Sequence, residues 1–258
     1  MKRIATAAVL VPVITYVVLL GPVWLLWLVT TAVAVVCFRE YCSIVTAYGL
    51  DRPGPLGYMA GLLVLLLPRG DVLIVTLICL LALTLMLRSR DLAKALPGAG
   101  ALLFGVIYVY GPWRSAIGLH AANPQWLFVV LALNWLGDTA AFYVGRAWGR
   151  HKMAPRLSPA KSWEGGAASL IASLVFGFFY LGWAIPDVAP ALRLAIPAAA
   201  NIAGQVGDLA ESLLKRGAGV KDSGTLLPGH GGWLDRVDGT LFALPLVHFL
   251  IVALGRAG

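Results

Sequence analysis

The residues best suited to chemistry gather between positions 208 and 238. This stretch holds five of the 12 acidic residues, namely Asp208, Glu211, Asp222, Asp235 and Asp238. It also holds four cations, which are Lys215, Arg216, Lys221 and Arg236. Cations beside glycines, which let a ligand approach the backbone, suit a polyphosphate. Asp235 and Asp238 stand three residues apart where a helix is expected to begin, and such carboxylates suit Mg²⁺. This combination predicts phosphoryl or nucleotidyl transfer, in which positioning and charge neutralisation do most of the catalysis.

A polar stripe leads into this cluster. Its members recur at steps of four, three, four and three: Asn201, Gln205, Asp208, Ser212 and Lys215. That spacing places them on one face of a helix. We expect the face to line a hydrated cavity, with Asp208 and Ser212 where the membrane meets the cytoplasm. A helix end fraying into solvent is the simpler alternative, but Asn201 and Gln205 lie too deep in the apolar run for it.

A second group of polar residues precedes the stripe. Asn134 and Asp138 form an i, i+4 pair late in an apolar run. Further on, Ser158 and Lys161 offer a hydroxyl and an ammonium before Glu164 and two glycines. A glycine-opened helix start favours an anion, so this segment is a candidate phosphate site. A buried hydrogen-bonded pair and an ordinary loop would explain the same residues without any function.

His230 is the one histidine in a polar setting. A zinc site would require His or Cys companions at a recognisable spacing, and none is present in the sequence. Contact with a phosphate, or a role in the loop, is therefore the favoured interpretation.

The composition of the chain indicates which kind of structural element carries these residues. Of the 258 residues, 60% are hydrophobic and only 12% are charged, against about a quarter charged in soluble domains. This excludes a soluble enzyme, a disordered protein and a nucleic-acid-binding domain. The pattern predicts an all-α, polytopic membrane protein, because apolar runs suited to a membrane helix recur along the chain. Nine spans are expected, over 4–20, 22–38, 55–68, 71–87, 100–119, 125–145, 166–185, 189–212 and 239–255.

Charge distribution predicts the orientation of these spans. With the N-terminus in the cytoplasm, sixteen of the 20 Lys and Arg residues fall on the cytoplasmic side, which is the positive-inside bias. The third span is short and lies between two prolines, so it could also be tilted or re-entrant. We expect one membrane domain, with scaffold helices in 1–120 and helices carrying a cytoplasm-facing site in 121–258.

The motifs resemble those of the phosphatidate cytidylyltransferases, the CDP-diacylglycerol synthases. The family signature is Ser-x-x-Lys-Arg, four residues, Lys-Asp, then Pro-x-His-Gly-Gly, two residues and Asp-Arg-x-Asp. It is present without a gap from Ser212 to Asp238. The stretch from Gly137 to Arg146 and the loop from Ser158 to Gly165 are also similar. Departures are small, with Trp233 in place of an aliphatic residue and Ser162 where Thr is common.

This resemblance implies transfer of a cytidylyl group from CTP to phosphatidic acid, releasing pyrophosphate. It implies Mg²⁺, as two divalent ions or together with K⁺, and a homodimer in a bacterial inner membrane. By analogy the metal is held by Asp208 and Asp235, with Asp238 beside them. The catalytic set would be these three with Lys215 and Lys221. The substrate-binding set would comprise Asp138, Ser158, Lys161, Glu164, Ser212, Arg216, Asp222, His230 and Arg236.

Two other functions suit part of the pattern. A CTP-dependent kinase of a polyprenol also meets CTP at a membrane, but it transfers the γ-phosphate. A transporter would carry its polar groups near the bilayer midplane, often in repeated halves. Here the polar groups gather at the predicted cytoplasmic end and no repeat is visible.

Overall fold

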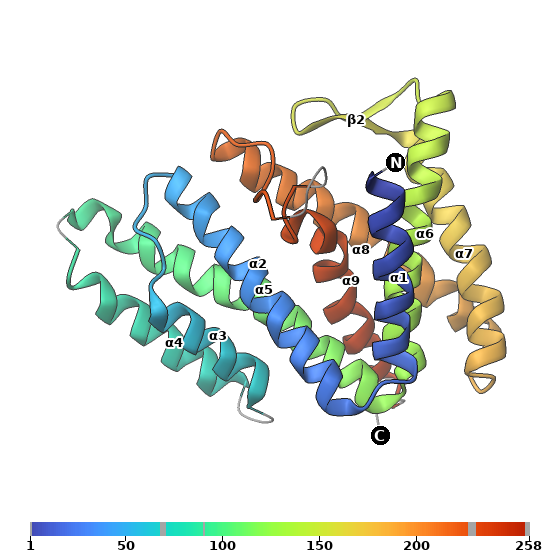
Figure 1. Ribbon diagram of the computed structural model, residues 1–258, viewed down its shortest axis with the longest axis horizontal. Helices are drawn as coiled ribbons and strands as arrows, with labels where there is room; N and C mark the ends of the chain where they lie inside the picture. The colour runs from blue at the N-terminus through green and yellow to red at the C-terminus, as the bar shows by residue number, and fades with distance from the viewer. Residues whose placement is uncertain (1, 68–70, 90, 227–230, 256–258) are drawn as a thin grey trace. The chain divides into compact units, whose positions relative to one another are not determined.

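The chain is built almost entirely of helices. A computed structural model describes residues 2–67, 71–89, 91–226 and 231–255. Within these ranges one α-helix occupies each of the nine apolar runs (Figure 1). The helices are α1 (Lys2–Leu19), α2 (Val23–Ala47), α3 (Pro55–Leu66), α4 (Asp71–Met86), α5 (Ala95–Ala122), α6 (Pro124–Trp148), α7 (Trp163–Ala184), α8 (Pro190–Gly217) and α9 (Leu234–Ala253). A 3₁₀ turn, η1 (Leu92–Lys94), precedes α5.

Five of the helical segments are long and apolar enough to cross a membrane within the described ranges. They are α2, η1 with α5, α6, α7 and α9. Three shorter apolar helical stretches cover Val9–Leu19, Pro55–Leu66 and Val72–Met86. Helix α8 has 28 residues, yet its polar residues keep it outside the apolar set. The fold is that of an all-α, multi-pass membrane protein.

Several helices extend beyond the apolar run that predicted them. Helix α2 continues nine residues past 38 and takes in Glu40, while α8 continues past 212 and takes in Lys215. Helix α9 begins at Leu234 rather than 239, so Asp235 and Asp238 both lie in its first turns. Hydropathy marks where apolar residues stop, whereas a helix continues as long as its backbone hydrogen bonds can form.

A small β-hairpin interrupts the helical pattern. Strands β1 (Lys152–Ala154) and β2 (Ser158–Ser162) pair antiparallel, with a register irregularity between Lys152 and Ala154. The predicted loop before α7 is therefore largely a strand. Helix α7 begins three residues earlier than expected, because the Ser162 hydroxyl caps it by accepting a hydrogen bond from the Gly165 N–H at 3.2 Å.

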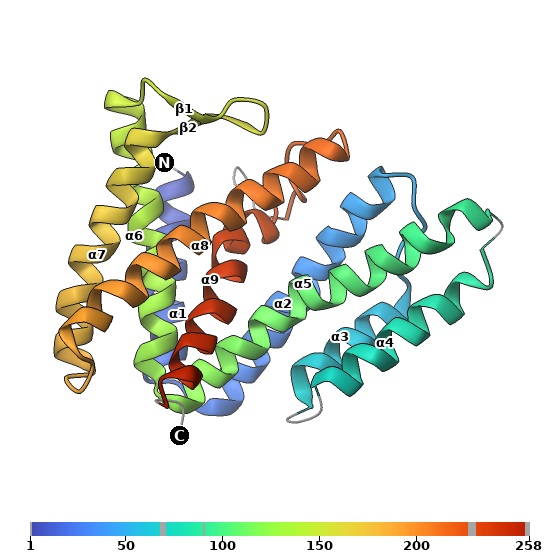
Figure 2. The same ribbon diagram turned by 180° about the vertical axis from the view of Figure 1, so that it is seen from behind.

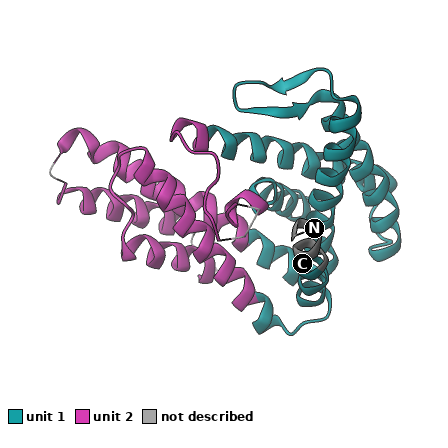
Figure 3. Ribbon diagram, turned by 45° about the horizontal axis from the view of Figure 1, so that its top comes forward, with its two compact units in different colours: residues 1–26, 115–213, 237–258 teal, residues 27–114, 214–236 magenta. Residues whose placement is uncertain are grey.

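The chain divides into two compact units that interleave in sequence (Figure 3). Unit 1 comprises residues 1–26, 115–213 and 237–258, and unit 2 comprises 27–114 and 214–236. In unit 1, α6 and α7 run side by side, and α1 packs against α6 (Figures 1 and 2). These units are defined by packing, whereas the division predicted at residue 120 is functional and stays a prediction.

A cluster of aromatic side chains joins three helices of unit 2. Phe38 and Tyr41 of α2 contact Tyr58 of α3 and Tyr110 and Phe104 of α5, with ring centroids 5.0–6.1 Å apart. Helices α3 and α4 also run side by side (Figure 2). This packing fixes α2, the helix that carries Glu40.

Candidate active site

Asn201 and Gln205, the first two residues of the polar stripe on α8, form hydrogen bonds with α7. Asn201 is 5% exposed, and its side-chain N–H groups donate to the hydroxyls of Ser169 and Ser173 at 2.8 and 2.9 Å. Gln205 donates to the carbonyl of Gly166 at 3.1 Å and to Asn201 Oδ1 at 2.7 Å. These amides were expected to line a hydrated cavity. Their hydrogen bonds instead join two helices, because a buried polar group requires a partner.

The lower part of the stripe carries charge. Asp208 forms an ion pair with Lys161 of β2, with Nζ and Oδ2 2.5 Å apart. Both side chains remain partly exposed, by 37% and 23%. The hairpin thus brings the predicted lipid-phosphate lysine directly to a predicted metal ligand. A phosphate at this position would compete with Asp208 for Lys161.

Four carboxylates gather in unit 1 near this ion pair. Asp138 of α6, Asp208 and Glu211 of α8 all lie close enough to Asp238 of α9 to repel its carboxylate. Glu211 is fully buried. Such a concentration of negative charge is costly unless a cation compensates it. The structure therefore brings together three of the predicted residues, Asp138, Asp208 and Asp238, with one that was not assigned.

Glycines let the helices that carry these acids approach closely. A Cβ at Gly207 of α8 would lie 2.7 Å from the main-chain oxygen of Asp238 and 2.9 Å from the ring of Phe242. A Cβ at Gly239 of α9 would lie 3.0 Å from the main-chain oxygen of Gly204. A side chain at Gly207 would force its neighbours to shift, and one at Gly239 would make a contact tighter than side chains usually adopt. The separation of the acids is thus set by backbone contact.

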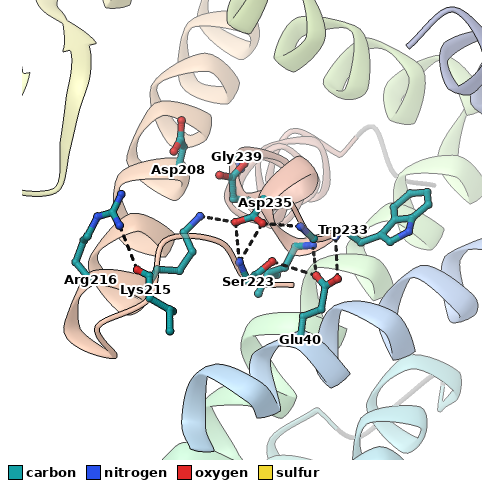
Figure 4. A network of polar contacts seen from close by, with 12 residues as sticks. Glu40, Asp208, Lys215, Arg216, Ser223, Trp233, Asp235 and Gly239 are labelled. Atoms are coloured by element: carbon teal, nitrogen blue, oxygen red, sulfur yellow. Dashed lines mark hydrogen bonds and ion pairs between the residues drawn. The ribbon is translucent and has the colours of Figure 1, made fainter. Parts of the chain in front are cut away.

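A second group of predicted residues meets in unit 2 (Figure 4). Lys215 Nζ lies 2.5 Å from Asp235 Oδ1, and the two side chains are only 10% and 6% exposed. The backbone N–H of Ser223 donates to both Asp235 oxygens at 3.2 and 3.0 Å, and that of Gly232 donates to Oδ2 at 2.7 Å. Through this ion pair and these hydrogen bonds, Asp235 at the start of α9 contacts both the end of α8 and the loop that follows it.

The other predicted residues differ in exposure. Ser212 is buried, Ser158 is half-buried, and the four charged residues Arg216, Lys221, Asp222 and Arg236 are exposed. Arg216 donates to the carbonyl of Val220 at 3.2 Å. Glu164 pairs with His151 at 2.7 Å, so it fastens the base of the hairpin. His230 lies outside the described residues.

The carboxylates predicted to bind Mg²⁺ are ligands of the kind that this ion prefers. Mg²⁺ is usually held by one or two carboxylates together with phosphate and water oxygens. Asp208 and Asp238 belong to the acidic group in unit 1, whereas the oxygens of Asp235 accept hydrogen bonds from protein donors. Among the described residues, no group of three or more His, Cys, Asp or Glu side chains could hold a metal ion. The metal assignment stays a prediction.

Comparison with known sequences identifies the family. A model of the cytidylyltransferase family matches residues 1–254. The chain belongs to the cytidylyltransferase family. It is 35% identical to the phosphatidate cytidylyltransferase of Staphylococcus saprophyticus, over 98% of this chain and 99% of that one. It is 33% identical to the protein of the same name from Staphylococcus haemolyticus, over 97% and 98%. A further relative of that name, from Haemophilus influenzae, is 42% identical over 127 residues, which are 48% of this chain and 44% of its own.

The cytidylyltransferase signature from Ser212 to Asp238 connects two helices. It begins in the last turns of α8 and ends in the first turns of α9, and the described part of the connection is held by Asp235. The family model and the named relatives confirm the resemblance seen in the sequence.

One buried residue in this region was not predicted. Glu40 of α2 is 3% exposed and accepts hydrogen bonds from Ser223, Trp233 and Leu234. It stands just beyond the apolar run 22–38, outside every predicted span and motif. One feature of the sequence could have indicated it. Glu40 follows an uninterrupted apolar run by two residues, and a helix that continued past the run would bury this acid.

Proposed function

We infer that the protein transfers the cytidylyl group of CTP to phosphatidic acid, forming CDP-diacylglycerol and pyrophosphate. The observation that carries this function is the match to the cytidylyltransferase family over residues 1–254. The named relatives at 33–35% identity align with nearly the whole chain. A multi-pass membrane fold suits a reaction between a soluble nucleotide and a lipid.

In this reaction a phosphate oxygen of phosphatidic acid attacks the α-phosphorus of CTP. A new P–O bond forms, the bond from the α-phosphorus to the bridging oxygen breaks, and pyrophosphate leaves with that electron pair. The attacking oxygen is already anionic, so the site needs no strong general base. The chain must instead hold two anions in line and offset their charge.

We assign the two anions to different residues. Lys161 and Ser158 on β2 hold the lipid phosphate, with Glu164 fixing the hairpin through His151. Lys215, Arg216, Lys221 and Arg236 bind the phosphates of CTP, supported by Ser212, Asp222 and His230. Proteins usually bind a polyphosphate through several Lys and Arg side chains, and Arg can form two hydrogen bonds to one phosphate.

Mg²⁺ is proposed as the cofactor, with a second divalent ion or K⁺ as further options. Asp208 and Asp238, with Asp138 nearby, would hold it in unit 1. Asp235, whose oxygens accept hydrogen bonds from protein donors in unit 2, is kept as a further proposed ligand. Bound there, Mg²⁺ would offset the negative charge of the triphosphate and of the leaving pyrophosphate. Lys161 would then be released from Asp208 for the lipid phosphate.

The membrane topology is also a proposal in its finer details. We propose nine spans with a cytoplasmic N-terminus, an active site facing the cytoplasm and a homodimer in a bacterial inner membrane. The positive-inside distribution supports the orientation. The nine helices at the expected ranges, within the described residues, support the number of spans.

Labelled CTP tests the function directly. The purified protein in detergent micelles is incubated with phosphatidic acid, Mg²⁺ and CTP labelled at the α-phosphate. We expect the label to appear in the lipid product. Label remaining in free CDP, with phosphate added to the lipid, would instead indicate a kinase, and the absence of any lipid product would contradict both enzymes.

Replacing Lys161 with Met tests the lipid-phosphate assignment. We expect the KM for phosphatidic acid to rise at least about tenfold, since a charge-assisted hydrogen bond contributes about 1.5–3 kcal/mol. The KM for CTP should change much less. Arg156→Met, which removes another exposed cation of the same hairpin, serves as the control and should leave both constants unchanged. An equal rise of both constants in the Lys161 variant would contradict the assignment.

A further inference from the structure

The buried carboxylate of Glu40 binds two separate segments of the connection between α8 and α9 (Figure 4). Its Oε2 accepts from the hydroxyl of Ser223 at 3.1 Å and from the N–H of Leu234 at 2.8 Å. Its Oε1 accepts from the N–H of Trp233 at 3.1 Å. These partners are 183–194 residues away in sequence. Glu40 therefore joins helix α2 to a part of the chain that is distant in sequence.

The contact with α9 has the chemistry of a helix cap. Leu234 is the first residue of α9, and Trp233 precedes it. The first N–H groups of a helix lack partners within the helix, and the positive end of its dipole favours a negative charge. Here the capping carboxylate comes from α2 instead of from the residue before α9.

Two glycines make room for this carboxylate. A Cβ at Gly224 would lie 2.7 Å from Glu40 Oε1, and a Cβ at Gly232 would overlap both Glu40 and the hydroxyl of Ser223. These positions require glycine because the chain passes directly against the carboxylate. The glycines therefore have a packing reason in addition to any contact with a ligand.

Glu40 and Asp235 hold the same two segments. Ser223 donates its N–H to Asp235 and its hydroxyl to Glu40. Gly232 donates its N–H to Asp235, while the next residue, Trp233, donates to Glu40. The described ends of the connection are thus fixed between two carboxylates, and Asp235 is in turn paired with Lys215. Losing Glu40 would release the segments that carry Asp222 and Arg236.

We propose that Glu40 is a positioning residue for the nucleotide. It contacts neither substrate but fixes the chain at Ser223 and at Trp233–Leu234, so that the neighbouring Lys221 and Arg236 bind the phosphates of CTP. This inference rests on the proposed function in one respect, namely that these cations bind CTP. It assigns a functional role to the N-terminal half of the chain, through α2.

Glu40→Gln tests this role with minimal change in size. One carboxylate oxygen becomes an NH₂ group that cannot accept from a backbone N–H, so the N–H contact at that oxygen is lost together with the negative charge. We expect the Kd for CTP, measured by equilibrium binding to the purified protein in detergent, to rise about tenfold or more. The KM for CTP should rise in parallel. The KM for phosphatidic acid should change by less than about twofold, which is the effect of losing a weak contact.

Ser223→Ala provides a second measurement if Glu40→Gln does not fold. It removes one of the donors to Glu40, so we expect a smaller rise in the Kd for CTP, about threefold. When both single variants fold, the double variant should weaken CTP binding by less than the product of the two effects, because the residues share one contact. Ser43→Ala, on the exposed side of the same helix, is the control and should bind CTP normally.

The outcomes separate this inference from the function itself. An unchanged Kd for CTP in folded Glu40→Gln, or in Ser223→Ala where that is the variant measured, would overturn the role of Glu40. So would an equal loss of affinity for both substrates. If the wild-type protein binds CTP but forms no CDP-diacylglycerol, the proposed function fails, whereas the effect of Glu40 on CTP binding is still measured.

Discussion

Replacing Asp235 with Asn should abolish formation of CDP-diacylglycerol, with a loss of at least about 100-fold in kcat. The variant removes the ion pair between Asp235 and the buried Lys215. Breaking a buried pair by removing one member typically costs about 3–5 kcal/mol. We therefore expect a lower melting temperature in detergent as well as lost activity, measured with α-labelled CTP on the same preparations.

A double variant separates these two effects. Asp235→Asn combined with Lys215→Met removes both charges, so most of the stability should return while the activity stays absent. Asp51→Asn, an exposed aspartate in the same unit, is the matched control and should change neither quantity. Recovery of activity in the double variant would show that Asp235 acts only as a structural anchor. It would then remove Asp235 from the predicted metal ligands.

Replacing Gly207 with Ala should reduce kcat by about 100-fold while the protein still inserts into the membrane. The added methyl group would lie 2.7 Å from the main-chain oxygen of Asp238 and 2.9 Å from Phe242, so α8 and α9 must separate locally. A displacement near 1 Å can cost about this factor in a site that depends on position. Overpacking of this kind also destabilises by about 1–3 kcal/mol.

The Mg²⁺ concentration that gives half-maximal activity tests the same variant more specifically. It should rise in Gly207→Ala, because the separation between Asp208 and Asp238 changes with the helices that carry them. Gly100→Ala, in a helix with no atom within 4 Å of the added Cβ, is the matched control and should keep full activity. Wild-type activity in Gly207→Ala would show that the acids do not act together.

The helices of the described ranges could be predicted because each contains a run of apolar residues, and such runs are visible without knowledge of their partners. Their ends could not be predicted in the same way. Lys215, Asp235 and Glu40 all lie where a helix continues into polar sequence, and only tertiary partners decide how far it continues. The β-hairpin escaped prediction because its strands have three and five residues, too few for a periodic pattern.

Candidate site residues could be recognised in the sequence where residue type and spacing coincide. The signature from Ser212 to Asp238 identified both Lys215 and Asp235, yet not that they pair with each other. The amides Asn201 and Gln205 were recognised as one face, but their contact was misjudged, since Ser169 and Ser173 of α7 look like ordinary small residues in an apolar run. Glu40 has no motif around it, and its role depends on residues 183 or more positions away.

The contact between α7 and α8 also constrains how the chain enters the bilayer during synthesis. Alone in lipid, α8 would expose the amides of Asn201 and Gln205 to hydrocarbon, at a high cost in free energy. Helix α7 is apolar enough to insert by itself, and it offers Ser169, Ser173 and the Gly166 carbonyl as partners. Because α7 precedes α8 along the chain, these partners are synthesised before the amides that require them. The two helices would then enter the membrane as a hairpin.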